Sequence, residues 1–125
     1  MQTYETSNVT PWMGSLAALA STEQLEGGMV AYEGGQSTDF ATAGAVAAQT
    51  APGMRGVTSA LIDSWFANSG GTLFYYKLCS ADTWGLAENI GYDIDADPGY
   101  SANPNTSTEK DPKWGAVRQV VTLGH

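Results

Sequence analysis

The chain is short of the residue types on which several common kinds of functional site depend. Cys79 is the only cysteine and His125 the only histidine among 125 residues. An intrachain disulfide is therefore excluded. A zinc site built from cysteine or histidine, or an internal Ser-His-Asp triad, is not expected either. We expect no metal or organic cofactor.

Basic residues are also scarce, with five Lys plus Arg against thirteen Asp plus Glu and a net charge of −8. Nucleic acid and anionic membrane surfaces are disfavoured as partners, because both require a basic face. No apolar run approaches the roughly 18 residues that span a bilayer. The first residues also lack the parts of a signal peptide, so a secretion signal would be absent or outside this chain. The acidic, Ser-, Thr-, Asn- and Gly-rich composition suggests an extracellular setting.

Hydrophobic residues make up 42% of the chain, which is enough for one folded domain. In chain order, the patterns predict a helix over 10–26, a strand over 29–32, a short helix within a loop over 40–49, a helix over 54–68, a strand over 72–79 and a helix over 113–123. This order makes two βα units with a preceding helix, so we predict an α/β fold with parallel strands. The near-continuous apolarity of 72–79 predicts burial on both faces of that strand.

Local patterns predict how these helices begin, end and pack. Thr10 before Pro11 predicts a capped helix start, and Gly27 and Gly28 predict its positive-φ stop. The aromatic side chains of Trp12, Trp65, Phe66 and Phe74 are expected in the core. The inward faces of the last two long helices are predicted to carry Met54, Val57, Thr58, Leu61, Ile62, Trp65 and Phe66, and Trp114, Val117, Val120 and Val121.

The stretch from Met29 to Gln36 is the main candidate for a functional site. A strand-forming run ends here in Glu33, and Gly34 and Gly35 follow at once. Barrel enzymes keep catalytic groups at the C-terminal mouths of their strands, beside flexible backbone. The alternative is a strand and glycine turn in which Glu33 is merely solvated.

Residues 80–111 form a segment far longer than the usual connection between elements. Asp93, Asp95 and Asp97 alternate there as in a calcium loop. Pro98 occupies the position that an EF-hand reserves for glycine, and Pro104 occupies the position of its last Glu. An EF-hand is therefore excluded, which leaves an irregular calcium site at the three aspartates or a solvated acidic loop.

Several landmarks together resemble one family. They are Val30-Ala31-Tyr32-Glu33-Gly34-Gly35-Gln36, then Trp65 with Gly70-Gly71-Thr72-Leu73-Phe74, then Tyr75-Tyr76 with Trp84-Gly85-Leu86, and finally Asp111-Pro112-Lys113-Trp114. Over about residues 10–123 the chain resembles the C-terminal part of a (β/α)8-barrel retaining glycoside hydrolase of the cellulase-like kind. Each landmark is short, but the four occur in the order that the family shows.

The resemblance implies that Glu33 is the nucleophile at the end of the seventh barrel strand. It implies that Trp84 stacks on a sugar, that Tyr32, Gln36 and Tyr76 shape the pocket, and that the ligand is a carbohydrate. A retaining glycosidase also needs a second carboxylic acid about 5–5.5 Å from the nucleophile. In the family that acid closes the fourth strand, which would lie upstream of Met1, and Glu88 is the only candidate substitute in this chain.

A complete barrel needs about 200 residues or more. We therefore interpret residues 1–125 as a single partial barrel-like segment with a long mouth loop at about 80–111. Another chain, or missing upstream sequence, is expected to cover the strand edges, because bare edges invite aggregation. The alternative function is a non-catalytic carbohydrate-binding or structural module of a larger extracellular or virion-like complex. An inactive gene fragment is the third possibility.

Overall fold

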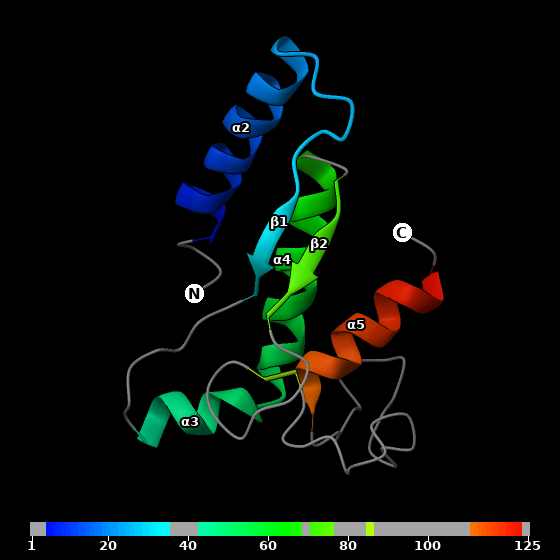
Figure 1. The fold of residues 1–125 in the computed structure, drawn as a ribbon. Coiled ribbons are helices and arrows are strands. Elements are labelled where there is room, and N and C mark those ends of the chain that lie inside the picture. Colours follow the sequence, from blue (N-terminus) through cyan, green and yellow to red (C-terminus); the bar gives the residue numbers. More distant parts are fainter. Residues whose placement is uncertain (1–4, 36–42, 69–70, 77–84, 87–110, 124–125) are drawn as a thin grey trace. The chain divides into compact units, whose positions relative to one another are not determined.

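The computed structural model describes residues 5–35, 43–68, 71–76, 85–86 and 111–123. Its elements are a π-helix η1 (Glu5–Val9), α2 (Thr10–Thr22), β1 (Ala31–Gly34), α3 (Ala43–Gln49), α4 (Gly53–Asn68), β2 (Leu73–Tyr75) and α5 (Pro112–Leu123), shown in Figure 1. β1 and β2 pair in parallel, which confirms the predicted α/β fold with parallel strands. Within these ranges, no helix combines the length and apolarity needed to cross a membrane.

The chain divides into two compact units. The first unit comprises Met1–Gly34 and Ala60–Tyr75, and the second comprises Gly35–Ser59 and Tyr76–His125. The first unit therefore holds η1, α2, both strands and the C-terminal part of α4. The second holds α3, the N-terminal part of α4 and α5. The organisation of the chain as a partial barrel stays a prediction.

The start of α2 differs from the one predicted. The π-helix η1 leads directly into α2, and the N-cap residue Val9 makes no side-chain capping hydrogen bond. The Thr10 hydroxyl instead shares a hydrogen bond of 2.9 Å with the Ser64 hydroxyl of α4. The prediction that Thr10 caps the helix was therefore wrong, because the preceding turn is already helical.

The end of α2 also falls earlier than predicted, at Thr22, with Glu23 as its C-cap. Gln24 follows with a positive φ of 55°. Its N–H donates to the Ser21 carbonyl, and the N–H of Leu25 donates to the Ala20 carbonyl. This bonding is a Schellman motif, in which the left-handed position is usually glycine. The prediction that Gly27 and Gly28 stop the helix was thus wrong, since Gln24 does so.

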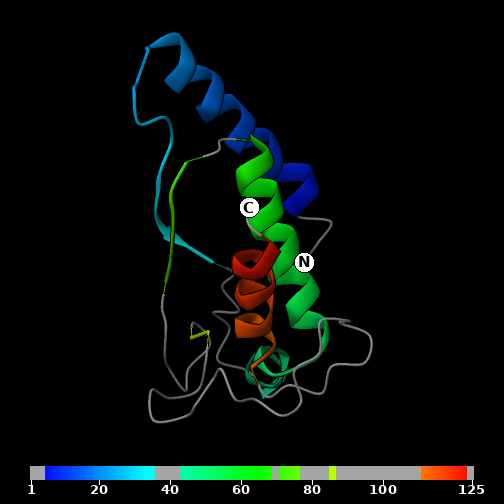
Figure 2. The same cartoon turned by 90° about the vertical axis from the view of Figure 1, so that its right-hand side faces the viewer.

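Helices α2 and α4 run parallel to each other and meet through small residues. Thr10 and Ser64 share a hydrogen bond, and a Cβ placed on Gly14 would lie 3.6 Å from the Asn68 side-chain oxygen. Thr10 and Gly14 are about one turn apart, as are Ser64 and Asn68, so the two helices advance in the same direction. Figure 2 shows α4 to one side of the strand pair.

The buried face of α4 is centred one residue away from the predicted stripe. Met54, Thr58, Ile62 and Trp65 are buried, whereas Val57 and Leu61 are only half-buried. Phe66 is exposed, so its predicted place in the core was wrong. Phe66 follows Ile62 by four residues and would share its side of the helix by spacing, but Trp65, three residues after Ile62, takes the buried position at this end of α4.

The turn between α4 and β2 is held by Trp65 and by a close backbone approach. The Trp65 indole Nε1–H donates to the Gly71 carbonyl oxygen at 2.9 Å. A Cβ on Gly71 would lie 2.8 Å from the carbonyl carbon of Met29. Immediately afterwards, the Ala31 N–H donates to the Thr72 carbonyl at 2.9 Å. Gly71 therefore lets the start of β2 reach the start of β1.

The strand pair is not covered on both faces. Phe74, in the middle of β2, is 60% exposed, and Tyr32 in β1 is 84% exposed. The predicted burial of this strand on both faces was therefore wrong, and so was the predicted core position of Phe74. The reason is that the part of the sheet described here has two strands, with α4 to one side of them (Figure 2).

In the second unit, α5 begins at Pro112, one residue before the predicted start, and its N-terminal end is buried. Asp111, Lys113 and Ala116 are buried, but Val121 is exposed, so its predicted inward position was wrong. The small residues Gly115 and Ala116 occupy the buried side instead, while Trp114, Val117 and Val120 are half-buried. Within the same unit, the guanidinium of the buried Arg55 donates to the Gln119 side-chain oxygen at 3.1 Å.

Candidate functional site

The predicted nucleophile lies in β1 rather than just after it. Glu33 is the third of the four strand residues, because β1 ends at Gly34 and not at Tyr32 as predicted. The two strands are parallel, so their C-terminal ends share one edge of the sheet. Glu33 is exposed and stands near that edge. This is the location in which α/β folds collect functional groups.

An irregular register presents Glu33 and its neighbour together. Ala31 pairs with Leu73 and Gly34 pairs with Tyr75, so β1 advances three residues while β2 advances two. In a regular strand, consecutive side chains point to opposite faces. The extra residue has the form of a β-bulge, which breaks this alternation and often stands beside active sites. Tyr32 and Glu33 are accordingly both exposed although they are consecutive.

Both glycines after Glu33 have a structural reason. A Cβ on Gly34 would collide with the Leu73 side chain and would lie 3.4 Å from the Phe74 carbonyl oxygen. Gly35 has a φ of 128°, which L side chains rarely adopt. The two glycines thus serve strand pairing and the chain's exit from the strand, whatever Glu33 does chemically.

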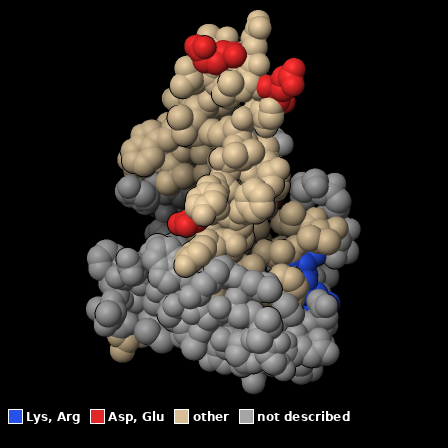
Figure 3. Space-filling view, viewed as in Figure 1, with Lys and Arg blue, Asp and Glu red and all other residues tan. Residues whose placement is uncertain are grey.

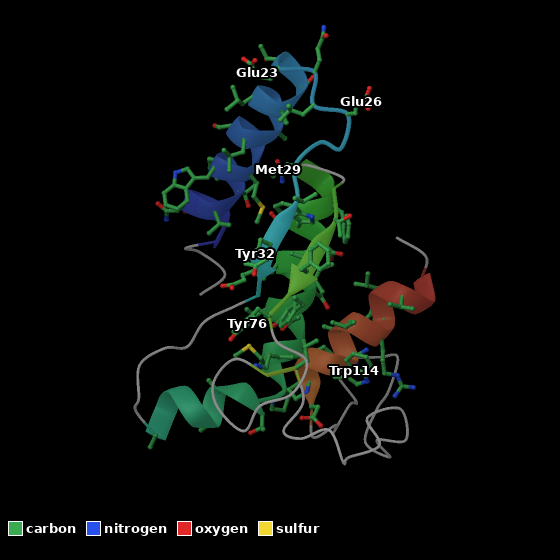
Figure 4. All side chains as sticks on the ribbon, viewed as in Figure 1. Glu23, Glu26, Met29, Tyr32, Tyr76 and Trp114 are labelled. Carbon is green, nitrogen blue, oxygen red and sulfur yellow. The ribbon has the colours of Figure 1, made fainter. Side chains whose placement is uncertain are left out.

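Two aromatic side chains stand next to Glu33. Tyr32 is 84% exposed and Phe74 is 60% exposed, and each follows the paired residues Ala31 and Leu73 by one position. Figure 4 shows the Tyr32 side chain on β1. Exposed rings beside a carboxylate offer flat apolar surface to the C–H faces of a sugar.

Phe74 is the candidate that sequence reasoning missed. Its apolar neighbours made it look like a core residue, and its exposure depends on which residues of two distant segments pair. No local signal in the sequence gives this pairing, because it joins segments that are separated by α3 and α4.

Of the other predicted site residues, Tyr76 is the one that the structure describes. Tyr76 is exposed and belongs to the second unit. Gln36, Trp84 and Glu88 lie outside the described residues, as do Asp93, Asp95 and Asp97 of the suggested calcium site. Among the residues that are described, no group of three or more His, Cys, Asp or Glu could hold a metal ion.

Two other carboxylates of the first unit stand away from the candidate site. Glu23 is the C-cap of α2, and Glu26 follows in the connection to β1. Figure 4 shows both beyond Met29, on the side opposite Tyr32. Neither is therefore placed to act as the second carboxylic acid beside Glu33.

Comparison of the chain with protein families, curated proteins and solved structures gives no significant match. The resemblance to glycoside hydrolases accordingly stays a prediction from the sequence motifs.

Proposed function

We propose that this chain is the C-terminal segment of a retaining glycoside hydrolase that acts on a polysaccharide. Glu33 is its nucleophile, and the acid/base group comes from outside this chain. One observation carries the proposal: an exposed carboxylate stands on an irregular strand end, on the edge where two parallel strands finish, beside exposed aromatic rings. Secretion to the extracellular space, where polysaccharides are met, belongs to the same proposal.

The chemistry follows from the residue type. The ionised Glu33 carboxylate attacks the anomeric carbon, a C–O bond to Glu33 forms, and the glycosidic C–O bond breaks. The leaving oxygen takes a proton from the separate carboxylic acid. That group then removes a proton from water, and the water releases the sugar from Glu33. Tyr32 and Phe74 would bind the apolar face of the ring and orient it.

The packing of the helices supports a barrel origin. α2 and α4 precede β1 and β2 respectively, run parallel to each other and contact one another directly. In a (β/α)8 barrel all helices lie on the outer side of the sheet, so successive helices are parallel neighbours. The exposed rings of Tyr32 and Phe74 would then face the barrel interior, where side chains from further strands would surround them.

The nucleophile can be tested without the missing acid. A 2-deoxy-2-fluoroglycoside with a dinitrophenolate leaving group needs no protonation to depart, so attack by Glu33 alone gives a stable glycosyl-protein ester. A panel of β-gluco, β-manno, β-galacto and β-xylo reagents is incubated with the chain, and the labelled peptide is located by mass spectrometry. We expect one label, on Glu33, from at least one reagent.

The control is a matched pair of variants. Glu33→Gln should abolish labelling, whereas Glu26→Gln, which removes another exposed carboxylate of the same unit, should leave it unchanged. Labelling at any other residue, or none from the whole panel, contradicts the assignment of Glu33 as nucleophile.

A second candidate function is non-catalytic carbohydrate binding, which the exposure of Tyr32 and Phe74 favours. In this case Glu33 is not labelled, yet the chain is retained on an insoluble polysaccharide. Replacing both aromatic residues by Ala would release it, and Glu33→Gln would not. Retention that survives the loss of both rings contradicts this function.

A further inference from the structure

Helix α2 carries its bulky apolar side chains on its exposed side. Trp12, Leu16 and Leu19 recur at helical spacing, and each is more than half exposed. We name these three residues the α2 stripe. The contacts with α4 are made by Thr10 and Gly14 instead. A helix of a globular protein normally buries its large apolar residues, so an exposed stripe of this kind indicates a surface that another molecule covers.

The charges around the α2 stripe are all of one sign. The first unit contains no Lys or Arg, and its charged residues are Glu5, Glu23, Glu26, Glu33 and Asp63. In Figure 3 the described surface of the first unit is mostly uncharged, and its charged side chains are acidic. Glu23 caps α2 and Glu26 follows closely, at the end of the helix where the backbone dipole is also negative.

This charge distribution decides between possible occupants. A second copy of the chain would bring a net charge of −8. If it docked through the same surface, acidic groups would face acidic groups with no basic residue to compensate them. An anionic membrane is disfavoured for the same reason. A cationic partner gains both the apolar contact and the attraction of Glu23 and Glu26.

We propose that the α2 stripe docks an amphipathic helix of a partner protein. Its apolar face covers Trp12, Leu16 and Leu19, and its Lys or Arg residues meet Glu23 and Glu26. A helix is the matching shape, because Trp12, Leu16 and Leu19 recur at helical spacing and form one apolar line along α2. The proposal does not depend on the role of Glu33, which lies on the strand pair.

The probes are two fluorescent peptides with leucines at helical spacing. One carries lysines at its polar positions, and its twin carries glutamates there. Binding to the chain is followed by fluorescence anisotropy at two salt concentrations. We expect the lysine peptide to bind, its affinity to fall as salt rises, and the glutamate peptide not to bind.

Variants without a new charge locate the contact. Leu16→Gln should weaken binding of the lysine peptide about tenfold or more, because one buried leucine is worth at least that factor. Val121→Gln, at an exposed apolar position of α5, should leave the affinity unchanged. Glu23→Gln combined with Glu26→Gln should reduce the affinity for the lysine peptide and the dependence of that affinity on salt. Asp63→Asn on α4 should reduce both quantities less. Circular dichroism of each variant shows that the fold is kept.

Several results would overturn the proposal. Equal binding of the two peptides, or a Leu16→Gln affinity equal to that of the parent chain, removes the role of the stripe and its charges. Sedimentation at pH 7 in low salt that shows dimers of the chain, lost in Leu16→Gln, identifies a second copy as the occupant. Binding of phosphatidylcholine vesicles that Leu16→Gln abolishes identifies a membrane surface. Failure of the lysine peptide to bind also contradicts the proposal.

Discussion

Glycines determine how closely the two strands of the first unit can approach. At Gly71 a side chain would meet the Met29 backbone, and at Gly34 it would meet Leu73. The obstacle at Gly71 is rigid, whereas the obstacle at Gly34 is the end of a leucine side chain. Gly71 is therefore the position at which substitution has the larger cost. Both glycines belong to sequence motifs that resemble those of glycosidases. The close approaches explain why glycine stands at these positions even if the chain has no catalytic activity.

Gly71→Ala is expected to lower the free energy of unfolding by about 2 kcal/mol, because forcing atoms into a packed site costs about 1–3 kcal/mol. Urea denaturation followed by tryptophan fluorescence measures the loss. Gly56→Ala is the matched control, since a Cβ at this exposed position in α4 meets nothing within 4 Å. It should stabilise the chain by about 0.5–1 kcal/mol. Equal effects of the two substitutions would contradict the close approach of Gly71 to Met29.

At the scale of elements, the periodicity of apolar residues predicts most helices and strands, but not where they end or which side they bury. The helix at 10–26 stops four residues early, because Gln24 adopts the left-handed conformation ahead of Gly27. The buried stripe of α4 centres on Thr58 and Ile62, since helix packing, not hydrophobicity alone, selects the face. The ends and buried sides of helices depend on contacts between segments far apart in the sequence, such as Thr10 with Ser64, which the local sequence does not report.

Gln24→Gly is expected to stabilise the chain by up to about 1 kcal/mol. A non-glycine residue in the left-handed region costs roughly 1–2 kcal/mol, and the greater freedom of glycine in the unfolded chain offsets part of the gain. Thermal denaturation followed by circular dichroism should show a higher Tm. Gln24→Ala retains the strain and serves as the control. If both variants melted at the same temperature, the positive φ at this helix end would not limit stability.

The irregular pairing of β1 and β2 could not have been predicted from either strand alone. Ala31 and Leu73 are separated by α3 and α4 in the sequence, and the extra residue becomes visible only when both pairs of the register are known. The sequence did place Glu33 at a strand end with glycines beside it. It did not predict that Tyr32 and Glu33 would both be exposed, nor that Phe74 would join them.

At the scale of the whole molecule, scarce basic residues and exposed apolar side chains act against each other. A net charge of −8 keeps copies apart at neutral pH, while the α2 stripe and the aromatic rings of the strand pair favour association. The sequence pI is about 4.2, so protonation of carboxylates removes the repulsion as the pH falls towards that value.

The chain is therefore expected to be monomeric at pH 7 in low salt and to associate as the pH approaches the pI. Raising the salt concentration at pH 7 should favour association in the same direction, because salt screens the repulsion. Light scattering across a pH series measures the onset. Leu16→Gln should associate less than Val121→Gln at every pH below neutrality. Association that is strongest at pH 7 in low salt would contradict this account.

The irregular register of β1 makes residue count more important than residue type at the candidate site. Replacing Tyr32 changes one ring and leaves the spacing between Ala31 and Gly34 intact. Deleting Tyr32 would let β1 pair regularly with β2, and ordinary alternation would then decide which face receives the Glu33 side chain. A relative of this chain that is one residue shorter here would keep the carboxylate in its sequence yet present it differently. The number of residues between Ala31 and Gly34 is therefore a better guide than the identity of the motif residues to whether Glu33 is presented in the same way.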